Sequence, residues 1–345
     1  MSVESIVQST QIVLASRPDG APTTDNFRLE AVNLPELTDG EVLIRIIYLS
    51  LDPYMRGRMS SAESYADPVE IGEVMVGGTV GQVINSRHQG FESGDYVLAS
   101  AGWQSHAVVD GAHLRKLDPA VAPLSTSLGV LGMPGFTAYS GLLKIGQPQE
   151  GETVVVAAAT GPVGSAVGQI AKRKGARAVG IAGGPEKCAY LRDELGFDAA
   201  VDHKAPDFVE QLRTAVPDGI DVYFENVGGE VAEAVLPLLN QYARVPVCGL
   251  IAHYNDATAP EGPDRLPGFL SRVLVKSLTI RGFIVSEFES MYGDFLRDVS
   301  GWIREGRFAY REDFVDGIEN APTAFIGLLE GKNFGKMLVR VAEES

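Results

Sequence analysis

The chain has few cysteines and no long uninterrupted apolar segment, and both absences narrow what it can be. Only two cysteines, Cys188 and Cys248, occur among its 345 residues, which excludes a disulfide-stapled scaffold and a four-cysteine zinc lobe. No run approaches the ~20 apolar residues that a membrane-spanning helix needs. The N-terminus MSVESIVQSTQIVLASRP lacks the basic start and apolar core of an export signal. We therefore expect a cytoplasmic protein with no membrane partner.

Basic residues are scarce relative to acidic ones. The chain has 29 lysines and arginines against 45 aspartates and glutamates, a net charge of −16 at pH 7. Nucleic acids and anionic membrane surfaces repel an acidic protein, so neither is an expected partner. The charge balance says nothing about a small-molecule substrate. The length predicts about two domains.

The segment 153–175, TVVVAAATGPVGSAVGQIAKRKG, combines three features in a fixed order. Residues 153–159 form a continuous apolar run, which is typical of a strand buried on both faces of a parallel sheet. A glycine-bearing turn follows, and apolar residues then recur at helical spacing. In such a unit Gly161 lets the backbone approach a pyrophosphate, and Gly164 lets the helix pack on the strand. The helix N-terminus would offer N–H groups to the phosphates.

An ordinary strand-to-helix turn is the alternative, because Ala159 stands where the usual motif has its first glycine. The next ~80 residues favour the dinucleotide interpretation, because they alternate between strand and helix patterns. Strands are predicted at 177–182, 199–202, 220–226 and 244–250, and helices at 186–195, 207–215 and 230–239. We therefore predict a Rossmann-type doubly wound parallel sheet.

The second of these strands predicts the cofactor. NAD enzymes carry an acidic residue about 20 residues beyond the glycines, but this strand ends in Gly183 and Gly184. An acid there would repel a 2′-phosphate. The basic residues Lys187, His203 and Lys204 follow instead, which favours NADPH over NADH. For Lys187 alone, a solvated surface lysine is the alternative.

Residues 1–132 have a different sequence pattern, which predicts short strands at 41–50, 75–83 and 96–99 between turns rich in Gly, Pro and Asp. This predicts a small β-barrel-like domain. Tyr54 follows its first strand and, taken singly, is better explained as a packed aromatic than as a catalytic group. Tyr254 begins a polar loop at the carboxyl end of a Rossmann strand, where ligands bind in such sheets. Tyr254 is therefore the better candidate for ligand contact.

The C-terminal part continues with further elements. Helices are predicted at 269–276 and 291–305, a strand at 278–285, and in the block 320–341 a helix, a turn at 331–335 and a strand at 336–341.

Ordered blocks along nearly the whole chain resemble the zinc-independent medium-chain dehydrogenase/reductases, specifically the leukotriene B4 12-hydroxydehydrogenase/prostaglandin reductase group. The blocks are LDPYMRGRM (51–59), MVGGTVG (75–81), GMPGFTAY (132–139), VVAAATGPVGS (155–165), GIAGGPEKC (180–188), ENVGG (225–229), CGLIAHYN (248–255) and NFGK (333–336). Three segments, SLGVLGMPGFTAY, GPDRLP and NAPTAFIGLLEGKNFGK, look most like the bacterial NADPH-dependent curcumin/dihydrocurcumin reductases.

The resemblance implies a division into domains and a set of cofactor contacts. It implies a GroES-like β-rich catalytic domain at 1–132, completed by 306–345, and a Rossmann NADPH-binding domain at 133–305. The strand near 278–285 would pair across a homodimer. The implied NADPH contacts are Thr160, Gly161, Pro162, Val163, Gly164, Gly184, Lys187, His203, Asn226, Cys248, Gly249, Leu250, Ile251, Tyr254, Phe283, Ile284, Val285 and Asn333. His203 stands where the group commonly has a tyrosine.

The resemblance also implies a metal-free reaction. Zinc-dependent relatives have cysteine and histidine ligands, whereas this chain has no cysteine before Cys188 and has Gly72-Glu73 in place of Gly-His-Glu. The implied activity is reduction of a carbon–carbon double bond conjugated to a carbonyl, with hydride going to the β-carbon. Enones and enals, curcumin-like or prostaglandin-like, are the expected substrates.

Negative charge on the carbonyl oxygen would need hydrogen-bond donors, for which Tyr254, Tyr54 and the nicotinamide ribose hydroxyl are candidates. We prefer Tyr254 as the catalytic donor, with Tyr54 and Met133 lining the substrate pocket beside it. A quinone reductase and a secondary alcohol dehydrogenase stay open as alternatives. A non-catalytic NADPH-binding protein is an alternative of a different class.

Overall fold

The computed structural model describes residues 7–256 and 263–344. By its internal packing the chain divides into two compact units. Unit 1 comprises Met1–Gly129 and Glu312–Ser345, and unit 2 comprises Val130–Arg311. Both ends of the chain therefore belong to unit 1. No helix within 7–256 and 263–344 is both long enough and apolar enough to cross a membrane.

Unit 2 is built on a six-stranded parallel sheet with the order β10-β9-β8-β11-β12-β13. Its strands are β8 (Thr153–Ala157), β9 (Arg177–Ala182), β10 (Ala199–Asp202), β11 (Ile220–Phe224), β12 (Leu239–Val247) and β13 (Thr279–Gly282). Its helices are α2 (Met133–Gly141), α3 (Pro162–Arg173), α4 (Pro185–Asp193), α5 (Phe208–Ala215), α6 (Gly229–Val235), α7 (Leu266–Lys276) and α8 (Tyr292–Arg304).

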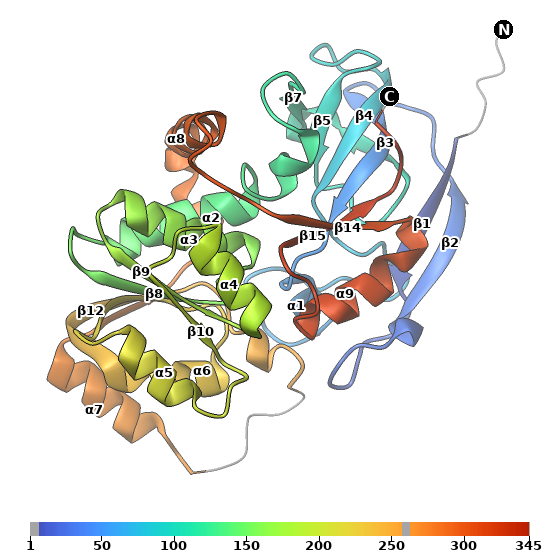
Figure 1. Cartoon of the computed structure of the whole chain (residues 1–345). Coiled ribbons are helices and arrows are strands. Elements are labelled where there is room, and N and C mark those ends of the chain that lie inside the picture. Colours follow the sequence, from blue (N-terminus) through green and yellow to red (C-terminus); the bar gives the residue numbers. More distant parts are fainter. Residues whose placement is uncertain (1–6, 257–262, 345) are drawn as a thin grey trace, which may run out of the picture. The chain divides into compact units, whose positions relative to one another are not determined.

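The strand order places a single reversal at the middle of this sheet. The chain starts at β8, steps outward through β9 to β10, then crosses back to β11 and steps the other way. Helices α3 and α4 cover one face, and α5 and α6 cover the other (Figure 1). The chain therefore continues from β8 along one face of the sheet and from β11 along the other face. Ligands of such sheets bind at this point, outside the carboxyl ends of the strands.

Burial explains why these segments form the elements they do. All five residues of β8 are buried, as expected for a central strand with helices on both faces. Helix α5 turns Phe208 and Leu212 toward the sheet, and α6 turns Val231 and Val235 toward the same core. These pairs are spaced four residues apart, so each falls on one face of its helix.

Unit 1 is a β-rich unit completed by the C-terminal segment. Its main sheet has the order β14-β15-β3-β4-β5-β7, with β6 also paired to β3, and β1 and β2 form a separate antiparallel pair. The strands are β1 (Gln8–Leu14), β2 (Phe27–Asn33), β3 (Glu41–Ser50), β4 (Thr79–Ser86), β5 (Tyr96–Ala99), β6 (His106–Asp110), β7 (Arg115–Leu117), β14 (Glu312–Asp316) and β15 (Lys336–Arg340). Two helices are α1 (Met55–Arg58) and α9 (Ala321–Leu329).

Within unit 1, a fully buried tryptophan contacts residues from both the N-terminal and the C-terminal segment. Trp103 stacks on Phe27 with ring centroids 5.5 Å apart and meets Phe325 of α9 edge-on at 5.6 Å. The C-terminal strand β15 pairs antiparallel with β3, with Leu338 opposite Ser50. Residues far apart in sequence therefore share one core.

The structure confirms the predicted α/β class, and two predicted strands were misplaced. The strand predicted at 75–83 begins only at Thr79, because Met75 instead exchanges backbone hydrogen bonds with Ile12 and Trp103. The strand predicted at 244–250 is β12, Leu239–Val247. Its first part was missed because the exposed Tyr242, with a φ of 64°, interrupts the alternating pattern.

Candidate functional site

The glycine turn after β8 has the shape that a phosphate-binding turn requires. The carbonyl of Ala158 accepts a hydrogen bond from the Gly161 N–H at 3.0 Å, and Ala158 itself has a left-handed φ of 51°. A Cβ on Gly164 would lie 2.4 Å from the Ala158 carbonyl oxygen and 2.7 Å from the Ala159 Cα. Only glycine therefore lets α3 start this close to the turn.

The first turn of α3 offers its N–H groups outward. Gly161 is the N-cap residue, and no side chain in the described part of the chain caps this helix end. The first N–H groups of a helix have no partner within the helix and carry partial positive charge. Thr160 is buried, and Pro162 and Val163 are half-buried. The predicted contacts 160–164 therefore lie together at a helix start of the kind that suits an anion.

Asn226 ties the two central strands together at the reversal of the sheet. Its side-chain Nδ2 donates to the carbonyl of Ala157 at 2.9 Å, which joins the end of β8 to the segment after β11. Its own carbonyl accepts from the N–H of Ile251 at 3.3 Å. Asn226 therefore lies at the carboxyl-end crevice, where the strand order predicts a dinucleotide.

Glu225 shapes the turn that carries Asn226, and sequence reasoning missed it. Its carboxylate accepts hydrogen bonds from the N–H groups of Val227 at 2.7 Å and Gly228 at 2.9 Å. Burial raises the pKa of Glu225, while these N–H donors act in the opposite direction. The Glu225 carbonyl also accepts from the N–H of Cys248 at 2.9 Å. Glu225 thus stabilises both the turn that follows it and the start of the loop after β12.

Tyr254 folds back over the loop that leaves β12. The Leu250 N–H donates to the Tyr254 hydroxyl at 3.4 Å, and a Cβ on Gly249 would lie 2.9 Å from the same oxygen. Next to it, His253 Nε2 accepts from the Gly229 N–H at 3.2 Å. The structure therefore brings the predicted contacts 248–251 and Tyr254 together with Asn226, within unit 2.

Both cysteines have thiols whose pKa is raised by burial. Burial raises the pKa of Cys248 to about 12, and burial likewise raises the pKa of Cys188. A thiol with a raised pKa is neither a nucleophile nor a ready metal ligand at neutral pH. Cys188 is a buried packing residue, and Cys248 belongs to the loop that is predicted to contact NADPH.

Basic side chains gather around Gly183 at the end of β9. A Cβ on Gly183 would lie 3.0 Å from His203 Nε2 and 2.9 Å from Lys204 Cε. Partial burial, and then the charge of Lys204 with a smaller effect of Lys187, lowers the pKa of His203. The three basic residues predicted for a 2′-phosphate are therefore neighbours. Asp202 lies beside them, but one of its oxygens already accepts from the N–H groups of Gly184 at 2.8 Å and Lys204 at 2.9 Å.

The segment after β13 presents one side chain inward. Phe283 is buried, with its ring 6.2 Å from Phe224 and 5.9 Å from Phe288. A Cβ on Gly141 would lie 2.4 Å from its ring, so α2 packs directly on it. Ile284 is partly exposed, and its N–H donates to Glu287 at 2.7 Å. The ring of Phe283 is thus part of the core, and a cofactor contact from 283–285 would have to use the backbone or the next side chains.

Unit 1 holds two of the predicted residues. Tyr54 precedes α1 and packs against the cluster around Trp103. Burial, followed by the charge of Asp52, raises its pKa well above the ordinary value, so the phenol stays protonated at neutral pH. Asn333 lies between α9 and β15, where its Nδ2 donates to the Gly335 carbonyl at 2.7 Å. Met133, the remaining predicted pocket residue, begins α2 in unit 2 and is 40% exposed.

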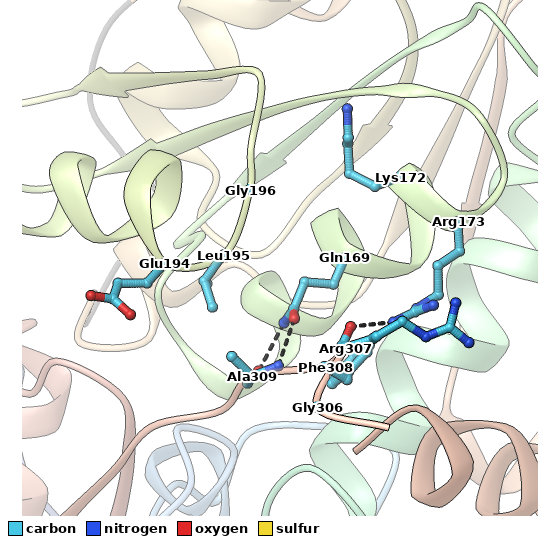
Figure 2. Close-up of a pocket in the computed structure, with 10 residues that line it drawn as sticks. All are labelled: Gln169, Lys172, Arg173, Glu194, Leu195, Gly196, Gly306, Arg307, Phe308 and Ala309. Atoms are coloured by element: carbon cyan, nitrogen blue, oxygen red, sulfur yellow. Dashed lines mark hydrogen bonds between the residues drawn. The ribbon is translucent and has the colours of Figure 1, made fainter. Parts of the chain in front are cut away.

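Unit 2 also contains a pocket of about 530 Å³ at the far end of α3 from the glycine turn. Figure 2 shows Gln169 of α3 joined to Ala309 by two hydrogen bonds, of 2.9 and 2.8 Å. Arg173 donates to the Arg307 carbonyl and stacks on Trp302 at 4.5 Å. These contacts fasten residues 306–309 to unit 2, although 306 was predicted to begin the return to the first domain. The pocket takes no part in the candidate dinucleotide site.

No cluster of three or more His, Cys, Asp or Glu side chains suited to a metal ion occurs among residues 7–256 and 263–344. The polar groups that gather at the sheet's carboxyl edge include backbone N–H groups, an amide, a phenol and basic side chains, while the carboxylates of Glu225 and Asp202 accept from backbone N–H groups there. Donor groups of these kinds bind phosphates and hydrogen-bonding ligands.

A parallel sheet with this strand order and a glycine turn at its reversal, together with a β-rich unit built from both chain ends, defines a dinucleotide-dependent oxidoreductase of two units. Comparison with known families agrees. Residues 10–117 match a model described as the N-terminal domain of oxidoreductase, and residues 162–300 match one described as zinc-binding dehydrogenase. The chain belongs to the medium-chain dehydrogenase/reductase superfamily, in the leukotriene B4 12-hydroxydehydrogenase/prostaglandin reductase group.

Individual relatives match over nearly their full length. The chain is 57% identical to the NADPH-dependent curcumin reductase of Escherichia coli (strain K12), over 96% of each chain. It is 43% identical to prostaglandin reductase 1 of Rattus norvegicus, over 97% of this chain and 100% of the relative. Among solved structures, CurA from Vibrio vulnificus in complex with NADPH has a TM-score of 0.94 and 57% identity, over 97% of this chain and 100% of CurA.

The close approach at Gly164 gives a direct test of the turn. Replacing Gly164 with Ala forces α3 away from the Ala158 carbonyl, so we expect the free energy of unfolding to fall by about 1–3 kcal/mol in urea titrations. Gly293→Ala is the matched control, because Gly293 also lies in the first turn of a helix and has nothing within 4 Å of a Cβ. Equal effects of the two substitutions would contradict this account of the turn.

Proposed function

We propose that this chain is an NADPH-dependent reductase of the carbon–carbon double bond in α,β-unsaturated carbonyl compounds. The observation that carries the proposal is the full-length similarity to reductases named for two different substrates, curcumin and prostaglandins. Both relatives are named as reductases, so the reaction type is what their two names have in common. The substrate class is therefore the conjugated enone or enal, and the particular substrate depends on the pocket.

The residues present fit NADPH. The turn 160–164 with the start of α3 would hold the pyrophosphate, and Asn226 with the loop 248–251 would border the rest of the dinucleotide. Lys187, His203 and Lys204 would face the 2′-phosphate, and the Asp202 oxygen Oδ1 beside them is held by two backbone N–H groups. We also assign contacts to Gly184, the segment 283–285 and Asn333. When bound, NADPH supplies the hydride for the β-carbon of the substrate.

The protein's own contribution to the chemistry is to stabilise and place charge. As the β-carbon gains hydride, the carbonyl oxygen of the substrate becomes negative and needs a donor, worth about 3 kcal/mol in comparable oxyanion sites. We assign this role to the hydroxyl of Tyr254, which the loop 248–251 holds at the edge of the sheet. Tyr54, kept protonated by burial, and Met133 would line the substrate pocket. The α-carbon then takes a proton, which completes the reduction.

We further propose that two copies of this chain associate through one edge of unit 2. Strand β13 ends the sheet and has a neighbour on one side only within the described chain. Beside it, α7 exposes Leu266, Leu270 and Leu274 at intervals of four residues, with exposures of 58%, 53% and 80%. An open strand edge next to an apolar stripe favours pairing with another chain. The partner we propose is an identical copy.

We place the enzyme in the cytoplasm. Cys188 and Cys248 are both unpaired, as is usual for proteins of a reducing compartment.

A substrate panel tests the proposed reaction. NADPH absorbance is followed with a linear enone, curcumin, a keto-prostaglandin analogue, a quinone and a saturated aldehyde, each with and without a chelator. We expect turnover on the conjugated carbonyls, unchanged by the chelator. Turnover confined to the saturated aldehyde, or lost on chelation, would point to an alcohol dehydrogenase, and binding of NADPH without turnover on any substrate would point to a non-catalytic protein.

The basic cluster predicts the cofactor preference. Lys187→Ala removes a charged donor, so the KM for NADPH should rise about tenfold while the KM for NADH stays unchanged. Lys174→Ala is the control, because this exposed lysine directly follows α3, at the opposite end from the glycine turn. An unchanged ratio of NADPH to NADH efficiency in the first variant would remove Lys187 from the phosphate site.

The proposed donor predicts a defect in chemistry without a defect in cofactor binding. Tyr254→Phe should lower kcat/KM for an enone by roughly a hundredfold, with the Kd for NADPH unaltered. Tyr242→Phe, at a tyrosine that is 68% exposed on β12, should behave as the wild type. If Tyr254→Phe retained full kcat/KM, the donor would have to be another group.

The proposed interface predicts that a substitution on α7 changes the oligomeric state. Leu274→Asp places a charge on the apolar stripe of α7, so sedimentation should show a dimer for the wild type and a monomer for this variant. Leu29→Asp changes a leucine that is 53% exposed on β2 of unit 1, and it should stay dimeric. A monomeric wild type, or a dimeric Leu274→Asp, would exclude this interface.

A further inference from the structure

We infer that a buried ion pair between Asp52 and Lys336 positions two segments of unit 1 together: the turn that carries Tyr54 and the loop that carries Asn333. The inference rests on the proposed function, because that function assigns Tyr54 to the substrate and Asn333 to NADPH. It adds two positioning residues that touch neither ligand and act through their neighbours.

The ion pair is fully enclosed and well coordinated. Lys336 Nζ donates to Asp52 Oδ1 and to the Leu51 carbonyl, both at 2.7 Å. The side chains of Lys336 and Asp52 are only 3% and 8% exposed. The second carboxylate oxygen of Asp52 accepts from the Ser50 hydroxyl. Each charge therefore has both an opposite charge and further hydrogen-bond partners, which a buried pair needs in order to be tolerated.

On one side the pair fixes the approach to Tyr54. Strand β3 ends at Ser50, and the Leu51 N–H donates to the Met337 carbonyl at 3.2 Å. The Asp52 carbonyl then accepts from the Met55 N–H at 3.1 Å, which closes the first turn of α1 around Tyr54. A shift of the Asp52 side chain would therefore move the backbone from which Tyr54 projects.

On the other side the pair fixes the loop of Asn333. Lys336 is the first residue of β15, and Gly335 before it accepts the side-chain hydrogen bond of Asn333. The Gly335 N–H donates to Asp313 of β14 at 2.8 Å. The loop 333–335 is thus held at Lys336 on one end and at Asp313 along its length. The pair connects residues separated by 284 positions in the sequence.

A third ionisable side chain lies close to the buried ion pair. Glu312 of β14 lies near Lys336 and accepts from the Ser125 hydroxyl at 2.8 Å. Its Oε1 is buried without a hydrogen-bond partner among the residues that the structure describes. The Lys336 ammonium group thus lies near two carboxylates, those of Asp52 and Glu312, with little water access. An apolar replacement of the pair could fill the space, but it would lack the directional bonds that set the two segments.

The test compares three variants with a matched control. Asp52→Asn and Lys336→Met each leave one buried charge without its opposite charge, and the double variant removes both charges together. The control is the pair Arg340 and Asp316, bonded at 2.6 Å on β15 and β14 of the same unit but exposed by 40% and 78%. It is tested as Asp316→Asn with Arg340→Met. Each protein is measured for melting temperature, for NADPH Kd by fluorescence titration, and for kcat and KM with an enone.

We expect both single variants to raise the NADPH Kd and to lower kcat/KM for the enone together, each by about tenfold or more, because small misplacements of site residues have effects of this size. The double variant should regain most of the melting temperature yet keep both defects. The exposed control pair should leave both constants unchanged. Ser50→Ala, which keeps the ion pair and removes one donor to Asp52, should show the same two defects in milder form.

Three outcomes would overturn the inference. The first is a double variant in which stability and both constants return to wild-type values, which would make the pair merely structural. The second is a change in only one of the two constants across the variants. The third applies if the single variants fail to fold. In that case, a Ser50→Ala variant and a double variant that both have wild-type Kd and kcat/KM would overturn the inference. A wild type without enone turnover would instead reject the proposed reaction, and the NADPH Kd series would still report on the Asn333 loop.

Discussion

The close packing of α3 on the end of β8 is the constraint on which the rest of unit 2 depends. The Ala158 carbonyl lies where a Cβ on residue 164 would have to go, so the helix can begin at this turn only with Gly164. This fixes the outward direction of the first N–H groups of α3. Asn226 then bridges to β8 across the reversal of strand order. Every other candidate cofactor contact in unit 2 is arranged around this edge of the sheet.

The two tyrosines are held by different kinds of contact. Tyr54 sits beside Asp52 among buried residues, so its proton is held tightly and its hydroxyl can donate but will not ionise at neutral pH. Tyr254 is instead positioned by backbone contacts within a short loop, including a hydrogen bond from the Leu250 N–H to its hydroxyl. A reduction that builds negative charge on a carbonyl oxygen needs a hydrogen-bond donor at that oxygen rather than a general base.

Much of the fold could be predicted from local sequence. The apolar run of β8, the glycine turn and the alternation that follows identify a parallel doubly wound sheet, because each signal lies within a few residues of the next. The predicted strands at 177–182 and 199–202 coincide with β9 and β10. Basic residues after β9 could likewise be noticed as a group, since Lys187, His203 and Lys204 all follow the ends of neighbouring strands.

The features that escaped prediction depend on contacts between distant residues. Lysines are seldom buried, so nothing in NFGK indicated that Lys336 would pair with Asp52 inside unit 1. Glu225 reads as a polar residue at a strand end, and only its two backbone N–H partners show that it shapes the Asn226 turn. Phe283 was grouped with the cofactor contacts, yet its ring packs on Phe224 and α2. Side-chain direction at such positions is set by packing that a single segment does not encode.

The most direct test of the central claim is to follow the hydride itself. An enone is reduced with NADPH deuterated at nicotinamide C4, on each face in turn, and the product is examined by NMR. The account predicts a saturated ketone with one deuterium on the former β-carbon, delivered from one face of the nicotinamide. An alcohol with deuterium on the carbonyl carbon, or a product without deuterium from either face, would contradict it.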